Sequence, residues 1–135
     1  MRSIIDQPYR YFLWVIFIFA AACKGSTYYE CFIDNQSAQT VKVISVQKVG
    51  LVNDTTDIPP GTRQGFFHTE KMGSDEYRPD PIGFFDTIQT QITGFVLSKN
   101  IMDSQEWKKE TKQTKRTPSI YLHQYTFNIT DADLQ

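Results

Sequence analysis

The sequence predicts an all-β protein, a single antiparallel β-sandwich of Ig-like or similar arrangement that follows an N-terminal signal segment. Val, Ile, Thr, Tyr and Phe, which favour strands, dominate five separate stretches after the signal. These stretches lack the apolar i, i+3, i+4, i+7 pattern of an amphipathic helix. Asn, Asp, Gly and Pro, which favour turns, are common between them. A chain of 135 residues is long enough for one domain and too short for two.

The first 22 residues are typical of an export signal. Arg2 and Arg10 make the start basic, and the twelve residues from Tyr11 to Ala22 carry no charge. Twelve helical residues span about 18 Å, which is short of a hydrocarbon core of about 30 Å. An export signal therefore fits better than a spanning helix, although a retained N-terminal anchor remains an alternative.

The end of this segment indicates which kind of signal it is. Ala20-Ala21-Ala22 leads directly into Cys23, and the polar Lys24-Gly25-Ser26 follows. This pattern resembles the lipobox of bacterial lipoproteins, in which the cysteine becomes the first mature residue and carries acyl chains. The resemblance implies a signal peptide over 1–22, lipidation at Cys23 and attachment to the cell envelope. The three alanines also fit an ordinary secretory signal, so a soluble secreted or periplasmic protein stays open.

The resemblance implies a tether over 23–26 and a folded domain over 27–135. The outer membrane is the expected membrane, and whether the domain faces the periplasm or the cell surface is left open. Cys31 is the other cysteine of the chain. In an oxidising compartment it could form a disulfide with Cys23, which would exclude acylation. If Cys23 is acylated, we expect Cys31 to be a buried, inert thiol.

Six to eight strands are expected between residues 27 and 130. The clearest are 28–33, 41–49, 65–69, 86–93 and 120–129. Between them lie turn-forming runs at 34–37, 53–54, 59–61, 93–94 and 117–119, and a long polar loop over 70–81.

Side-chain alternation predicts which faces of these strands are covered. Ile88, Thr90 and Ile92 alternate with polar residues, so one face of that strand should be buried. The strand 120–129 carries apolar residues on both sides, which is typical of a central strand. Adjacent phenylalanines, such as those at 66–67, point to opposite faces of a strand, so one of them should be partly exposed unless both faces are covered.

The segment 102–116 is polar and has no apolar stripe beyond Trp107. We predict a single turn over 103–107 and then a polar strand that ends at Lys115 and pairs with 120–129 through a turn at Pro118. The lysines of such a strand would protect a sheet edge from pairing with other chains. They could alternatively contact anionic lipid headgroups or glycans.

The order of short motifs resembles the small lipoproteins of Bacteroidota-type Gram-negative bacteria. The matching pieces are Cys23, the turn 34–37, Ile58-Pro59-Pro60-Gly61, Phe85-Asp86-Thr87-Ile88 and the Tyr-rich strand that ends at 125–131. This resemblance implies a β-sandwich of unknown function with no established biochemical activity.

Composition excludes one class of partner and offers no catalytic motif. With 14 basic and 15 acidic residues the chain lacks the positive field that nucleic acid requires. No nucleophile elbow, phosphate-binding glycine loop or zinc-protease motif occurs. The two histidines, His68 and His123, stand apart from zinc-ligand spacing, and no metal or cofactor is predicted. We predict that the protein is not an enzyme, with a hydrolase using His68 or His123 as the alternative.

The expected function is therefore binding of an envelope protein or glycan. Loops on a rigid sandwich commonly carry such sites, and exposed Tyr, Arg and Trp contribute much of the binding energy. The candidate binding residues are Tyr77 and Arg78 in the loop 70–81, with Trp107 at the base of the following hairpin, where a core position is the alternative for this side chain.

Lipidation makes a direct prediction about the mature N-terminus. We expect mass spectrometry of the N-terminal peptide to show an acylated Cys23, because one short uncharged segment that ends in Ala-Ala-Ala-Cys serves as both signal and attachment site. More than one acyl chain is expected, since a single chain binds a membrane only marginally. An unmodified Cys23, or an intact Met1, would contradict the prediction.

Overall fold

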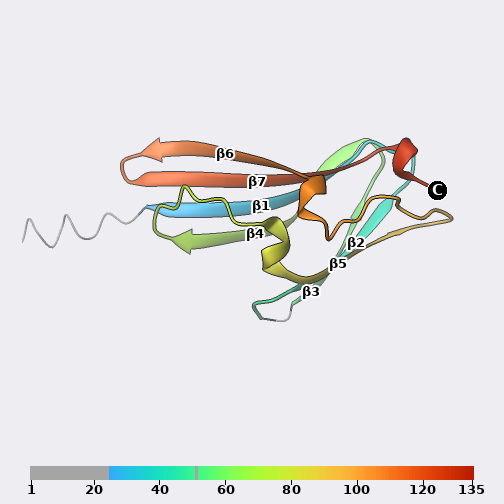
Figure 1. The fold of residues 1–135 in the computed structure, drawn as a ribbon, viewed down its shortest axis with the longest axis horizontal. Coiled ribbons are helices and arrows are strands. Elements are labelled where there is room, and N and C mark those ends of the chain that lie inside the picture. The colour runs from blue at the N-terminus through green and yellow to red at the C-terminus, as the bar shows by residue number, and fades with distance from the viewer. Residues whose placement is uncertain (1–24, 51) are drawn as a thin grey trace, which may run out of the picture.

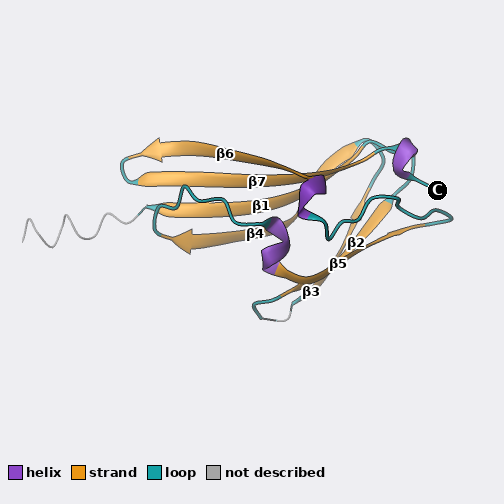
Figure 2. Ribbon diagram, in the orientation of Figure 1, coloured by secondary structure: helices purple, strands orange, loops and turns teal. Residues whose placement is uncertain are grey.

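The computed structural model describes residues 25–50 and 52–135, which form two packed β-sheets joined by turns (Figures 1 and 2). The strands are β1 (Ser26–Asn35), β2 (Val41–Gln47), β3 (Asn53–Ile58), β4 (Thr62–Met72), β5 (Phe85–Ile92), β6 (Trp107–Arg116) and β7 (Ser119–Ile129). Three short 3-10 turns complete the described part, namely η2 (Pro81–Phe84), η3 (Ser104–Glu106) and η4 (Asp131–Asp133). The predicted all-β sandwich is confirmed. The predicted signal and Cys23 lie outside the described residues.

One sheet has the strand order β4-β1-β7-β6 and the other β3-β2-β5. Neighbouring strands are antiparallel, as predicted, except for β1 and β7, which run parallel from the Ser26–Ile120 pair to the Asn35–Ile129 pair. Parallel neighbours need a long crossover, and here everything between β1 and β7 supplies it. Both central strands of the larger sheet therefore start at the same end.

The polar segment after residue 102 folds as predicted. Asp103 caps the single turn η3 by accepting a hydrogen bond from the backbone N of Gln105 at 2.9 Å. β6 follows and pairs with β7 at the edge of the sheet. In contrast, β3 occupies residues from which only a turn at 53–54 was expected. β3 is an edge strand with one buried residue, Ile58, so it lacks the apolar alternation by which strands are recognised.

Aromatic side chains fill the space between the sheets. A register shift between Cys31 and Phe32 leaves Phe66 as an extra residue in β4. Because of this bulge, Phe66 and Phe67 both contact Phe85, with ring centroids 5.7 and 4.8 Å apart. Adjacent phenylalanines thus contribute to one core, where a regular strand would have separated them.

Asn35, at the end of β1, joins the two sheets through its side chain. The fully buried amide nitrogen lies 2.8 to 3.2 Å from the carbonyl oxygens of Gln39, Ile58 and Pro59. Its oxygen accepts hydrogen bonds from both the backbone and the hydroxyl of Ser37. One side chain therefore satisfies polar groups in the β1–β2 turn and at the end of β3.

Replacement of Asn35 should consequently be costly. Asn35→Ala leaves buried carbonyl groups without donors, and we expect a loss of at least about 2 kcal/mol in the free energy of unfolding. Urea unfolding measures it. Gln36→Ala, at the exposed neighbouring position, is the matched control and should change stability by less than about 0.5 kcal/mol. Equal stability of the two variants would contradict the role given to Asn35.

Candidate functional site

The two sheets differ in length, and this difference creates the candidate site. Strands of the larger sheet have 10 or 11 residues, whereas those of the smaller sheet have 6 to 8. In Figure 1 the larger sheet extends past the smaller one toward the end where β1 begins. The segment 73–81, which we call the cover segment, lies across this extension.

Hydrogen bonds from inward-facing side chains hold the cover segment in place. Thr27 donates to the carbonyl of Gly73 at 2.7 Å and accepts from the backbone N of Asp75 at 2.9 Å. The Tyr125 hydroxyl donates to the carbonyl of Pro79 at 2.8 Å. Burial raises the pKa of Tyr125, so the phenol keeps the proton that it donates. The cover segment is thus part of the packed structure.

These contacts revise the roles expected of the candidate binding residues. Tyr77 is 74 % exposed and stays available for binding. Arg78 is exposed, but its guanidinium donates to the backbone carbonyl of Lys109 in β6 and ties the cover segment to that strand. Trp107 is only 4 % exposed and donates from its indole N to the carbonyl of Ile101 at 2.9 Å. This burial corrects the expectation that Trp107 lies on a binding surface.

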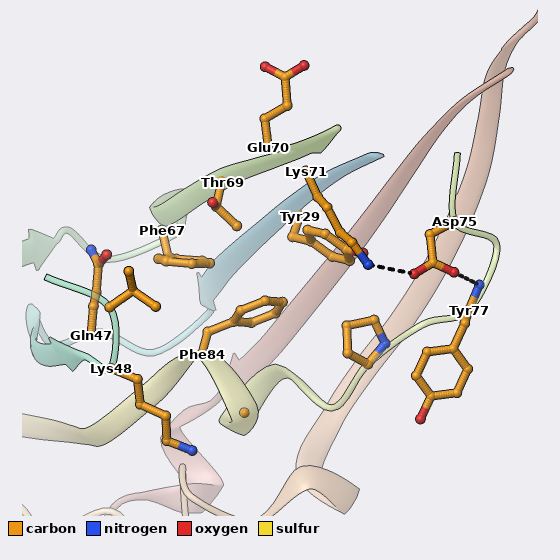
Figure 3. A pocket seen from close by; sticks show the side chains of 13 residues that line it. Tyr29, Gln47, Lys48, Phe67, Thr69, Glu70, Lys71, Asp75, Tyr77 and Phe84 are labelled. Atoms are coloured by element: carbon orange, nitrogen blue, oxygen red, sulfur yellow. Dashed lines mark hydrogen bonds and ion pairs between the residues drawn. The ribbon is translucent and has the colours of Figure 1, made fainter. Parts of the chain in front are cut away.

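A pocket of about 540 Å³ opens between the cover segment and the β2–β3 turn (Figure 3). Tyr29, Phe67 and Phe84 line its interior, and Figure 3 shows their side chains grouped between Gln47 on one side and Asp75 and Tyr77 on the other. The remaining lining residues are Lys48, Val49, Thr69, Glu70, Lys71, Pro79 and Gly83. The pocket therefore has an aromatic interior and a mainly polar rim.

The three rings form a concave wall. The Tyr29 and Phe84 ring centroids are 5.2 Å apart with planes inclined by 49°, and those of Phe67 and Phe84 are 5.2 Å apart at 33°. Val49, which is 87 % exposed, adds an apolar side chain to the rim. Sequence reasoning placed Val49 in a strand and did not single out the three rings, because residues from four separate segments meet here.

The rim carries charges of both signs. Lys71 and Asp75 form an ion pair at 3.3 Å that joins the end of β4 to the cover segment. The backbone N–H of Tyr77, at 2.9 Å, and then the Lys71 ammonium lower the pKa of Asp75, so this carboxyl stays ionised at neutral pH. Burial raises the pKa of Tyr29, and the charge of Asp75 raises it further. Lys48 is exposed on the same rim, whereas the side chain of Glu70 points away from the rings in Figure 3.

The two histidines differ in their surroundings. His123 is fully buried, with Nε2 2.9 Å from the carbonyl of Asp75 and Nδ1 2.9 Å from the hydroxyl of Thr111. A carbonyl only accepts, so Nε2 donates its proton to Asp75, and Nδ1 shares the second hydrogen bond with the Thr111 hydroxyl. His123 thus holds the cover segment and does not reach solvent. His68 is exposed, 3.5 Å from Glu30, and its ring stacks on Tyr28.

Within residues 25–50 and 52–135 there is no group of three His, Cys, Asp or Glu side chains placed to hold a metal ion. In the same range no helix is long and apolar enough to cross a membrane. No family model matches the chain, and neither a curated protein nor a solved structure is significantly similar to it. The function is therefore inferred from the pocket and from the N-terminal sequence.

The hydrogen bond from Tyr125 can be removed without changing the shape of the side chain. Tyr125→Phe should cost about 1 kcal/mol and speed amide hydrogen exchange within the cover segment about fivefold. Tyr121→Phe is the matched control, because the Tyr121 hydroxyl makes no hydrogen bond in the described part of the chain. Unchanged exchange in Tyr125→Phe would show that this bond does not hold the segment.

Proposed function

We propose that this protein is a lipid-anchored protein of the bacterial cell envelope, attached at Cys23, that binds another protein through the aromatic pocket and catalyses no reaction. The observation that carries the binding function is the pocket itself, in which Tyr29, Phe67 and Phe84 line a hollow that the smaller sheet does not cover. Concave apolar pockets with a few polar groups at the rim are typical binding sites.

The strand geometry of β1 supports acylation of Cys23 over its disulfide alternative. Gly25 continues β1, since the backbone N of Gly73 donates to its carbonyl at 2.7 Å. The Cα atoms of Gly25 and Cys31, six residue steps apart along the strand, therefore lie about 20 Å from each other. Two residues reach only about 7 Å, and bridged cysteines need Cα atoms within about 7 Å. Cys31 is thus out of reach of a cysteine two residues before Gly25.

The state of Cys31 agrees with this proposal. Its side chain is fully buried, and burial raises the pKa of the thiol well above its ordinary value. A thiol that stays protonated and has no access to solvent is a poor nucleophile. Cys31 therefore contributes to the core, and Cys23 is the cysteine proposed for modification.

The shape of the pocket favours a protein partner over a glycan. Sugars commonly stack on a flat, exposed aromatic face, whereas Phe67 and Phe84 are tilted against each other and enclose a hollow. Such a hollow suits an apolar or aromatic side chain inserted from a partner. Lys48 and the Lys71–Asp75 ion pair on the rim offer charges of both signs to polar groups around that side chain.

The surroundings of the histidines support a function without catalysis. His123 is buried and uses both ring nitrogens for hydrogen bonds. His68 lies at a hollow of about 410 Å³ whose lining includes Glu30 and Thr56 but no serine or cysteine. A hydrolase that forms a covalent intermediate would need an activated side-chain nucleophile within hydrogen-bond distance of the base.

The pocket is tested with rim variants that leave the fold intact. Val49 and Tyr77 are 87 % and 74 % exposed, so Val49→Ser/Tyr77→Ser should change stability by less than about 0.5 kcal/mol per site. We expect the double variant to bind the partner at least about tenfold more weakly. The partner is first captured from detergent-solubilised envelope with the full lipidated chain, and its affinity is then measured with purified components.

Val96→Ser is the control, because Val96 is also exposed and lies outside the pocket. Equal affinity of the wild-type chain and the double variant would contradict binding at the pocket. Binding on a glycan array that the double variant loses would reassign the occupant as a glycan. Turnover that disappears in His68→Ala would replace the binding function with catalysis.

A further inference from the structure

The first described residue lies between two other chain segments at one end of the larger sheet. The backbone N of Gly73, just after β4, donates to the carbonyl of Gly25. On the other side, Gly25 lies so close to Ser119 that a Cβ on this glycine would come within 1.8 Å of the Ser119 carbonyl oxygen. In Figure 1 the end of β4 and the β6–β7 turn lie at the end where the chain enters β1. We call this the entry end.

Cationic side chains lie at the β6 side of the entry end. Lys115 and Arg116 are the last residues of β6, opposite Ile120 and Ser119, and both are exposed. Lys112 is also exposed but lies opposite Leu122, at the level of Tyr28 and therefore about 10 Å from the entry end. Acidic residues are absent from the described chain between Glu110 and Asp131, so the hairpin turn itself is purely basic.

The carboxylates nearest to the entry end leave this positive charge in place. Asp75 is paired with Lys71 at 3.3 Å, and that pair adds no net charge. Glu70 lies opposite Tyr28, three residues along β1 from Gly25 and therefore about 10 Å from the entry end. Glu76, which is exposed in the cover segment, lines a surface hollow together with Gln113 and Tyr121, two residues along β6 from Lys115. Lys115 and Arg116 at the outermost part of the sheet therefore outnumber this carboxylate.

An exposed apolar side chain accompanies these cations. Met72 is the last residue of β4, opposite Ser26, and is 81 % exposed. Met72 shares this end of the sheet with Lys115, although β1 and β7 lie between the two strands and separate the residues by about 14 Å. Apolar and basic residues on one surface are typical of proteins that lie against anionic bilayers, where the apolar group enters the interface and the cations meet headgroups.

We propose that the entry end rests on the anionic surface of the membrane that holds the lipid anchor, with Lys115 and Arg116 on the headgroups and Met72 in the interface. The inference rests on the proposed acylation of Cys23, which would fix the acyl chains within about 7 Å of Gly25. The long axis of the sandwich then stands away from the membrane. Tyr29, four residues along β1, places the pocket about 13 Å above the entry end.

The test uses the full lipidated chain in nanodiscs that contain a gadolinium-chelating lipid, prepared with either neutral or anionic lipids. Backbone amides of the turn 116–119 should show paramagnetic relaxation at least about threefold stronger in anionic discs. At 1 M salt, where the Debye length is about 3 Å, the difference should disappear. Val96 donates its backbone N–H to the carbonyl of Gln135, and Figure 1 shows the C-terminus at the end of the sandwich opposite the entry end. The amide of Val96 should therefore show no dependence on lipid charge.

Charge variants identify the responsible residues. Lys115→Gln/Arg116→Gln should abolish the difference between anionic and neutral discs. Lys42→Gln/Lys48→Gln removes the same charge from exposed residues of the smaller sheet and its turn, and should leave the difference unchanged. Equal relaxation of the turn in both kinds of disc, with the chain still anchored, would overturn this inference and leave the anchor intact.

Failure of the anchor gives a different result. A chain that does not co-elute with neutral discs lacks the proposed lipid attachment. Sedimentation of that chain with vesicles of anionic lipid then decides whether the entry end binds by itself. Binding that Lys115→Gln/Arg116→Gln weakens about 25-fold would support the surface, since each of the two cations near an anionic surface contributes about a fivefold change in affinity. No binding would overturn it.

Discussion

The unequal length of the two sheets is the constraint on which the rest of this structure depends. Four strands of 10 or 11 residues cannot be covered along their whole inner face by strands of 6 to 8. Exposed backbone is cheap to solvate, but an exposed apolar sheet face is not. The cover segment supplies the missing layer, and where it meets the β2–β3 turn the layer stays open as the pocket.

The amino-acid sequence is adapted to this arrangement along the length of each strand. Facing the smaller sheet, the inner positions near the end of β7 are Phe127 and Ile129, which need only apolar neighbours. Under the cover segment they are His123 and Tyr125, which carry hydrogen-bond donors. An irregular segment has backbone carbonyls that no ladder satisfies, so the sheet beneath it must provide partners. The change from polar to apolar inner residues between Tyr125 and Phe127 thus marks where the cover segment ends and the smaller sheet begins to cover β7.

Local patterns in the sequence were sufficient for most of the fold, because strands and turns are encoded by neighbouring residues. The turn capped by Asp103 and the polar strand after it could be recognised this way. β3 could not, since an edge strand exposed on most of its surface has no apolar alternation. The parallel pairing of β1 with β7 and the bulge at Phe66 depend on contacts between distant segments, which no single stretch of sequence contains.

The candidate site was the least accessible to sequence reasoning for the same reason. Tyr77 stands out as an aromatic residue in a polar loop, and its side chain is exposed. Arg78 and Trp107 also belong to residue types that are common in binding sites, but here their side chains hold other parts of the fold in place. The pocket residues Tyr29 and Phe84 resemble ordinary core residues in sequence, and both also pack against their neighbours. Tyr29 and Phe84 line a pocket only because no other part of the fold packs over them at this point.

The composition of the rim connects binding with the stability of the whole domain. Val49 belongs to the turn of the smaller sheet, Lys71 to the edge of the larger sheet and Tyr77 to the cover segment. A side chain that inserts between them contacts all three parts at once and has no equivalent site on the unfolded chain. Its binding therefore adds directly to the free energy that holds the two sheets and the cover segment together, by about 2.7 kcal/mol at a hundredfold excess over the dissociation constant. The proposed partner would therefore stabilise the fold at the point where the cover segment leaves it open.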